Sequence, residues 1–221
     1  HGVPFAGYEV DDQPPARLGK MKAVILLNGE PYRGEIDASA ARVWCCDGAY
    51  EWAKDRVRID ENLGDYDSLS YMPDPPPAEV YPSEKNYTDG ELALMRAIAA
   101  GADEIEFYGG GGGREDHFLG NLHLLYAALK KGVRAVMVTN YARIFAAEGE
   151  VVVTGRKGST LSIVPFGGNV HIMENSGFYY PLPEAFVYGS TRGISNVVTA
   201  DTARFTVEGT VLVFIDEGGE L

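Results

Sequence analysis

The sequence predicts two domains: an α/β domain built on a parallel sheet, followed by a smaller antiparallel β-sandwich. Between residues 21 and 147, apolar runs alternate with segments of helical periodicity, as strands and helices do along a parallel sheet. After residue 147 only short β-type runs occur, separated by glycine-containing turns, which is typical of a small sandwich or barrel. The length of 221 residues is sufficient for two modest domains.

The first domain alternates four predicted strands with three predicted helices. The runs at residues 22–28 and 43–46 are almost wholly apolar, the pattern of strands buried on both faces. Such strands need helices on both sides of the sheet, so we predict a Rossmann-like domain over residues 21–147. The other predicted strands are residues 104–108 and 133–139, and the predicted helices are residues 49–56, 87–100 and 115–131.

The second domain is predicted to span residues 148–221 and to contain no helix longer than a turn. Residues 1–20 lack the charged and then apolar order of a secretory signal, so we interpret them as a poorly ordered leader or tag. The predicted strands of the second domain are residues 151–154, 159–165, 169–173, 197–200, 203–207 and 210–215.

Charge and composition narrow the class of function. The net charge of −13 disfavours binding to nucleic acid or to anionic lipid, which reward clustered Lys and Arg. No apolar run approaches the roughly 20 residues of a membrane span, and the adjacent Cys45 and Cys46 suit a reducing compartment. We therefore expect a cytoplasmic protein. A nucleotide site in such an acidic chain would need local positive charge from a metal, a few cations or helix N-termini.

Two acidic patches contain candidate ligands. Asp47 comes directly after residues 43–46, where it is placed either to cap the next helix or to bind a ligand at the end of a parallel strand. Asp65 and Asp67 have i, i+2 spacing, so both carboxylates point to one side of an extended chain. Such a pair indicates a divalent cation that keeps both ionised. The alternative is an exposed turn, because Gly, Asp and Ser are turn formers.

A third patch, residues 84–91, opens a predicted helix. Thr88 and Glu91 have the spacing of a capping box, in which each side chain bonds the other residue's backbone N–H. Asp89 in the first turn is favoured by the helix dipole. The capping box requires neither Asp89 nor Lys85, so roles as a metal ligand and as a phosphate partner remain open for these two residues.

The fourth patch is a glycine loop at residues 109–113, between a predicted strand and a predicted helix. Such a loop presents bare backbone N–H groups to an anion, and Arg114 adds donors suited to phosphate oxygens. The pattern is neither G-x-G-x-x-G nor G-x-x-x-x-G-K-[ST]. The alternative is a flexible loop in which Asp116 only balances the helix dipole.

Together these patches resemble the thiamine pyrophosphokinase family. The ordered motifs are CDGA at residues 46–49, GDYDS at 64–68, KNYTDGELAL at 85–94 and GGGGREDHFLGN at 110–121. The resemblance continues into the β-rich part, where Tyr180 takes the place of an aromatic residue that packs on thiamine, with Tyr179 as its rival. Two departures from the bacterial pattern are Asn86, where an Asp is usual, and Tyr180, where Trp is frequent.

The resemblance implies an enzyme that transfers diphosphate from ATP to thiamine, with Mg²⁺ as cofactor, AMP and thiamine diphosphate as products, and a homodimeric assembly. The expected catalytic residues are Asp47, Asp65, Asp67 and Asp89, of which Asp65, Asp67 and Asp89 are the expected metal ligands. The expected nucleotide-binding residues are Lys85, Gly111, Gly112, Gly113, Arg114, Asp116 and Asn121. The expected substrate-binding residues are Tyr180, Ser195 and Asn196.

The alternatives to this function are a related diphosphokinase, a nucleotide sensor and an oxidoreductase. A related diphosphokinase could use the same ATP machinery on another hydroxymethyl heterocycle such as a pterin, because acceptor specificity would lie in the β domain. A non-catalytic nucleotide sensor has little use for several metal-binding carboxylates. A dinucleotide-dependent oxidoreductase would carry G-x-G-x-x-G after its first strand, and this sequence lacks that motif there.

Overall fold

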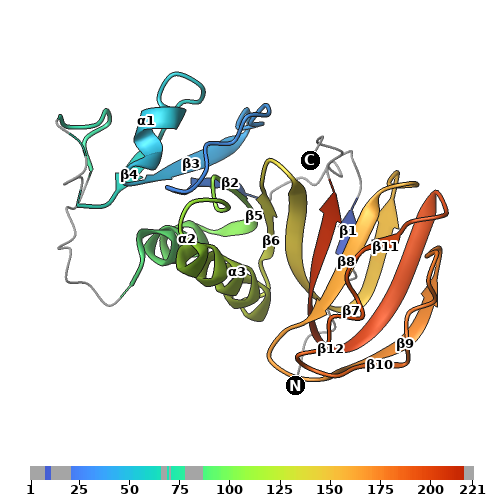
Figure 1. Ribbon diagram of the computed structural model, residues 1–221. Helices are drawn as coiled ribbons and strands as arrows, with labels where there is room; N and C mark the ends of the chain where they lie inside the picture. Colours follow the sequence, from blue (N-terminus) through green and yellow to red (C-terminus); the bar gives the residue numbers. More distant parts are fainter. Residues whose placement is uncertain (1–7, 11–20, 66–68, 70, 78–86, 217–221) are drawn as a thin grey trace. The chain divides into compact units, whose positions relative to one another are not determined.

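The structure is a computed structural model that describes residues 8–10, 21–65, 69, 71–77 and 87–216 (Figure 1). The chain divides into two compact units between Asn140 and Tyr141. We call Leu18–Asn140 the α/β unit and Tyr141–Leu221, with the N-terminal stretch, the β unit. The division precedes the boundary expected after residue 147, because β7 (Ala142–Thr154) pairs along its whole length with β12 (Thr202–Asp216).

The α/β unit contains the predicted parallel sheet. All four strand pairs are parallel, and the order across the sheet is β4-β3-β2-β5-β6. The first strand of the unit is therefore central, and the strand order changes direction between β2 and β5. The bounds are β2 (Met21–Leu26), β3 (Ala41–Cys46), β4 (Glu61–Leu63), β5 (Ala102–Tyr108) and β6 (Arg134–Val138).

Strand β4 was not predicted from the sequence. It has three residues, and its centre is Asn62, which is fully buried although polar. The NH2 group of the Asn62 side chain donates a hydrogen bond to the carbonyl oxygen of Pro75 at 2.8 Å, so a tertiary contact takes the place of water for this donor. A strand this short with a polar centre lacks the apolar run that marks its neighbours.

Helices cover both faces of this sheet (Figure 1). Helix α1 (Ala49–Ala53) packs its buried residues against a cluster that includes Val24 and Val43. On the other face, Gly90 of α2 (Asp89–Ala99) lies against Leu27, which follows β2, and Leu124 of α3 (Glu115–Lys130). Side chains alternate along a strand, so β2 is buried on both faces, as its continuous apolar run predicted.

The predicted helices are slightly too long. Helix α1 ends at Ala53 and not at residue 56, because the N–H groups of both Arg56 and Val57 bond to the Ala53 carbonyl and close the helix in a turn. Helix α2 begins at Asp89, since Thr88 is its N-cap. No helix among the described residues is long and apolar enough to span a bilayer.

The β unit is built around β12, which pairs antiparallel with β7, β8 and β9. Residues 203–207 and 210–215 were predicted as separate strands joined by a turn at Glu208-Gly209. They belong to one strand, and the register shifts between Val207 and Val211, so this turn is a bulge. The other strands are β8 (Thr160–Pro165), β9 (Val170–Ser176), β10 (Ala185–Phe186) and β11 (Asn196–Val197).

Residues 8–10 were expected to belong to a poorly ordered leader, but they form strand β1 (Tyr8–Val10). This strand pairs parallel with residues 151–153 of β7. The β unit has its own apolar core, separate from that of the α/β unit. This core contains large side chains from several strands, including Phe145, Phe186 and Phe205.

Candidate active site

The first two acidic motifs meet at the ends of β3 and β4. Cys46 pairs with Leu63 in the parallel register, and the backbone N–H of Asp47 donates to the Leu63 carbonyl at 2.7 Å, so pairing continues beyond the strands. A Cβ on Gly64 would lie 3.0 Å from the Cβ of Asp47, and the φ of Gly64 is +145°. Glycine at position 64 therefore lets the turn before Asp65 pass close to Asp47.

Asp47 has an unusual backbone conformation. Its φ is +43°, in the left-handed region, and among the described non-glycine residues this sign of φ is shared only by Ser195, at +60°. Both residues belong to the predicted site. Non-glycine residues in this region store on the order of 1 kcal/mol of strain, which is found most often at functional positions.

Asp47 does not cap α1. The N-cap is Gly48, which has helical dihedrals and makes no side-chain capping bond. The capping interpretation of Asp47 is therefore wrong. The charge of Asp47 acts on Cys45. Burial is the main reason why the pKa of the Cys45 thiol is raised, and the negative charge of Asp47 raises it further.

The third motif opens α2 as predicted. The Thr88 hydroxyl oxygen accepts a hydrogen bond from the backbone N–H of Glu91 at 3.2 Å, which confirms Thr88 as the cap. Asp89 is the first residue of the helix, and a Cβ on the adjacent Gly90 would lie 3.7 Å from the amide oxygen of Asn121 in α3. Asp89 therefore begins its helix close to α3 and to the end of β2.

Two expected site residues, Asp67 and Lys85, lie outside the described residues. Within the described ranges, no group of three or more His, Cys, Asp or Glu side chains is arranged to hold a metal ion. The metal set of Asp65, Asp67 and Asp89 therefore stays a prediction.

The glycine loop runs alongside the segment that follows β2. The N–H of Gly29 donates to the carbonyl of Gly109 at 2.8 Å, and the N–H of Glu30 donates to the carbonyl of Gly111 at 2.6 Å. A Cβ on Gly29 would lie 2.5 Å from the Gly109 oxygen, a distance that real structures do not show. The two loops therefore touch through backbone alone, and a side chain at position 29 would separate them.

The segment after β2 is part of the site that the motifs did not reveal. The side chain of Asn140, which follows β6, accepts from the N–H of Arg33 at 2.8 Å and donates to the carbonyl of Pro31 at 3.1 Å. These bonds hold residues 28–34 beside the glycine loop. The signal available in the sequence was the polar Asn28-Gly29 pair at the end of an apolar strand.

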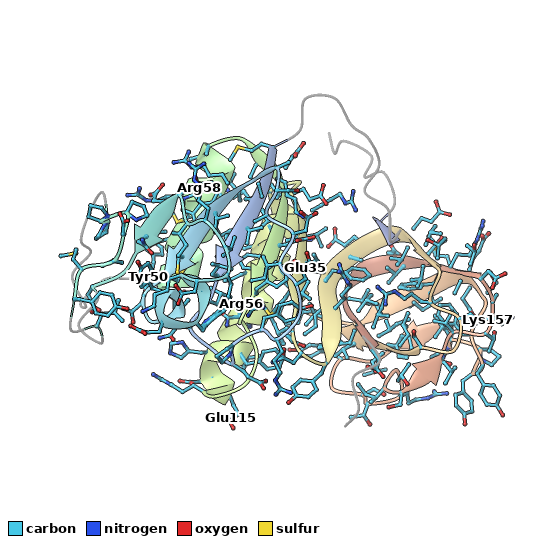
Figure 2. The ribbon with its side chains drawn as sticks, turned by 90° about the horizontal axis from the view of Figure 1, so that it is seen from above. Glu35, Tyr50, Arg56, Arg58, Glu115 and Lys157 are labelled. Carbon is cyan, nitrogen blue, oxygen red and sulfur yellow. The ribbon has the colours of Figure 1, made fainter. Side chains whose placement is uncertain are left out.

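At the start of α3, Arg114 and Asp116 bind each other. The guanidinium donates to both carboxylate oxygens, at 2.6 Å and 3.1 Å. This contact lowers the pKa of Asp116 and raises the pKa of Arg114. The side chains are 71% and 64% exposed, so the pair contributes little to stability and a phosphate could compete for it. Glu115, between them, points into solvent (Figure 2).

Asn121 holds the glycine loop from α3. Its side-chain amide donates to the carbonyl oxygen of Gly110 at 2.9 Å. The loop also contains Gly112 and Gly113, with φ of +68° and +72°, values that glycine adopts without strain. The expected nucleotide-binding residues Gly111, Gly112, Gly113, Arg114, Asp116 and Asn121 thus lie on or next to one loop.

The three expected substrate-binding residues are also neighbours, within the β unit. The side chain of Asn196 accepts from the N–H of Tyr180 at 3.0 Å and donates to its carbonyl at 2.7 Å. Asn196 is only 6% exposed, whereas the Tyr180 ring is 62% exposed and packs edge-on against Tyr179. The N–H of Ser195 donates to the Ser162 hydroxyl at 3.0 Å. Asn196 therefore fixes the backbone that presents Tyr180.

Residues 71–77 are held against α1. The backbone N–H of Asp74 donates to the hydroxyl of Tyr50 at 3.0 Å, and the hydroxyl of Tyr71 bonds both Glu51 and Lys54 of the helix. Tyr50, which is labelled in Figure 2, is buried at its ring. These bonds fix a segment shortly after the Asp65 turn.

Comparison with known proteins agrees with the order of the two units. Residues 34–137 match the family described as thiamin pyrophosphokinase, catalytic domain. Residues 148–212 match the family described as thiamin pyrophosphokinase, vitamin B1 binding domain. A thiamine pyrophosphokinase from Bacillus subtilis (strain 168) is 32% identical over 164 residues, which cover 70% of this chain and 77% of the relative.

Solved structures resemble the whole fold. The crystal structure of thiamine pyrophosphokinase from Bacillus subtilis is similar with a TM-score of 0.77 and 28% identity, covering 88% of this chain and 98% of that one. The enzyme from Geobacillus thermodenitrificans gives a TM-score of 0.73 and 25% identity, with coverage of 90% and 99%. The structure from Candida albicans shares the fold at 14% identity, with a TM-score of 0.74 and coverage of 97% and 94%. From these matches in sequence and structure, the chain belongs to the thiamine pyrophosphokinase family.

Proposed function

We propose that this enzyme transfers the diphosphate group of ATP to the hydroxyl of thiamine, giving AMP and thiamine diphosphate. The observation that carries the proposal is the presence of both family domains in order, with the acidic turns and the glycine loop at the carboxyl ends of one parallel sheet. The activity is that of a thiamine diphosphokinase.

The strand order supports a nucleotide site at the glycine loop. In open α/β sheets, ligands bind outside the carboxyl ends of the strands, where the strand order changes direction. In the order β4-β3-β2-β5-β6 this point lies between β2 and β5, and the loops after these two strands are the ones paired through Gly29 and Gly109. We take the unit to be Rossmann-like, with the phosphates of ATP on this loop and on the start of α3.

The acidic residues fit a divalent metal. Members of the family use ATP, typically with such an ion, and we propose Mg²⁺, which prefers carboxylate oxygens. The fit rests on the close approach of Gly64, the residue before Asp65, to Asp47. Asp65, Asp67 and Asp89 would hold the ion, which when bound neutralises charge on the phosphate oxygens.

The chain's own groups supply position and charge. The thiamine hydroxyl attacks the β-phosphorus of ATP, and AMP leaves. Asp47 accepts a hydrogen bond from the attacking hydroxyl, and the glycine loop, Arg114 and Lys85 bind phosphate oxygens. Phosphoryl transfer depends mainly on such positioning, so a strong base is not required.

Thiamine recognition is assigned to the β unit. The exposed Tyr180 ring offers a face to the cationic ring system of thiamine, and Asn196 and Ser195 hold the surrounding backbone. We also propose that the enzyme works as a homodimer in the cytoplasm, as the family resemblance implies.

A panel of acceptors tests the proposal. The protein is mixed with ATP and Mg²⁺, and AMP is measured with thiamine, with a hydroxymethylpterin, or with no acceptor. We expect AMP with thiamine only. Release of AMP with the pterin but not with thiamine would favour a related diphosphokinase, and ATP binding without turnover on any acceptor would favour a sensor.

A further inference from the structure

Asn28 lies at the centre of the proposed nucleotide site but belongs to none of its recognised motifs. It follows Leu27 at the end of β2, the central strand of the sheet. The chain stays extended here, because the N–H groups of Leu27 and Gly29 both bond to carbonyls of the β5 side. Leu27 faces α2 and α3, so Asn28 projects from the opposite face, toward the start of α1.

The side-chain amide of Asn28 packs closely on Gly48. A Cβ built on Gly48 would be 2.6 Å from its Nδ2, 2.7 Å from its Oδ1 and 2.8 Å from its Cγ. All three atoms at the end of the amide are thus within van der Waals contact of Gly48, which is the neighbour of Asp47 in the chain.

Glycine at position 48 is needed for this contact and not for its own conformation. Gly48 has φ −60° and ψ −10°, which any residue adopts, and it occupies an N-cap position where Ser, Thr, Asn or Asp are preferred. Any of those side chains would displace the Asn28 amide. Glycine at this position therefore leaves α1 without a side-chain cap but leaves space for the Asn28 amide.

The amide of Asn28 has no hydrogen-bond partner within the described part of the chain, and the residue is exposed. Asparagines that shape this unit behave differently. Asn121 and Asn140 each bond backbone groups of neighbouring loops. Asn28 is therefore packed against Gly48 while its amide stays available to a ligand.

We propose that Asn28 contacts the substrate, donating a hydrogen bond from its amide nitrogen to an oxygen of the diphosphate that is transferred. The inference rests on the proposed function. Asp47 and Asp65 offer only acceptors when ionised, and they repel phosphate oxygens. A neutral amide between them and the glycine loop provides a donor without adding negative charge.

Removing and displacing the amide should have linked effects. The activities of Asn28→Ala, Gly48→Ala and the double variant are compared as kcat/KM for ATP at saturating thiamine. We expect Asn28→Ala to lower this value by about 10- to 100-fold, the usual range for a hydrogen bond to a charged group. Gly48→Ala should lower it by displacing the amide, and should cost nothing further once Asn28 is already Ala.

Controls separate this role from folding. Gly168→Ala adds a methyl between β8 and β9 where nothing lies within 4 Å, so it should leave kcat/KM unchanged. Thermal midpoints of all variants should stay close to that of the wild type. Asn28→Asp, which replaces the donor by an acceptor of equal size, should be less active than Asn28→Ala because it adds a negative charge beside phosphate.

Three results would overturn the inference: wild-type kinetics for Asn28→Ala, an equal loss from Gly48→Ala in both backgrounds, or an Asn28→Asp variant as active as the wild type. Calorimetric titration with ATP and Mg²⁺ keeps the two proposals distinct. Failure of the wild type to release AMP with thiamine removes the proposed function. In that case, weaker ATP binding by Asn28→Ala would still support the role of Asn28, and unchanged binding would contradict it.

Discussion

Replacing Asp47 with glycine should separate stability from activity. At φ +43° the backbone of an L-residue is strained by about 1–2 kcal/mol, and by less for Asp, which tolerates this region. Glycine relieves the strain but gains roughly 0.4–1 kcal/mol of conformational freedom in the unfolded chain. These effects nearly cancel, so the free energy of unfolding should change by less than about 1 kcal/mol and Tm by less than about 4 °C.

Activity should respond very differently. If the Asp47 carboxylate contacts the attacking hydroxyl or the metal, its loss should lower kcat by about 100-fold or more, as for other groups that stabilise charge in a transition state. Thermal unfolding and thiamine-dependent AMP release are measured on Asp47→Gly, Asp47→Ala and Asp47→Asn. Ala should lose both stability and activity, whereas Asn should keep stability and lose activity. An active Asp47→Gly, or one that unfolds as easily as Asp47→Ala, would refute this reasoning.

Three further predictions concern the surroundings of the site. Gly29→Ala should weaken ATP binding at least tenfold in calorimetry, because its methyl would lie 2.5 Å from a backbone oxygen of the glycine loop. The control variant Gly168→Ala should bind ATP normally and resist urea slightly better. Tyr50→Phe removes a hydroxyl that accepts a backbone N–H, so urea unfolding should show a loss of about 1 kcal/mol; no change would mean that the bond is unimportant. Both cysteines are buried, so native protein at pH 8 should resist alkylation that modifies them in urea. Burial raises the pKa of Cys45, so stability should fall above about pH 8.5, where this thiol ionises only in the unfolded chain.

Most of the α/β unit could be predicted because its strands and helices differ in periodicity. The apolar run of β2 and the helical spacing of α3 are local signals, and the structure contains both elements close to the predicted bounds. Strand β4 was not predicted because its central residue, Asn62, is polar. Its NH2 group is paired with the carbonyl oxygen of Pro75, and no local sequence pattern connects these two residues. The bulge in β12 was taken for a turn because a glycine suits both.

The candidate site was predictable where chemistry and local structure agree. The glycine loop and the Thr88 cap are examples, since each depends on neighbouring residues. The position of Asp47 beside Gly64 depends on the register of two strands, which is a tertiary property. For the same reason the motifs did not reveal Asn28, whose neighbour Gly48 is distant in sequence.

The most direct measurement of the central claim follows the phosphorus atoms of ATP. With thiamine and Mg²⁺, ³¹P NMR should show loss of ATP with appearance of AMP and thiamine diphosphate in equal amounts, and the Asp67→Asn variant should be slower by orders of magnitude. Formation of ADP and a monophosphate ester, or unchanged ATP with an Asp67→Asn variant indistinguishable from the wild type, would contradict the assignment.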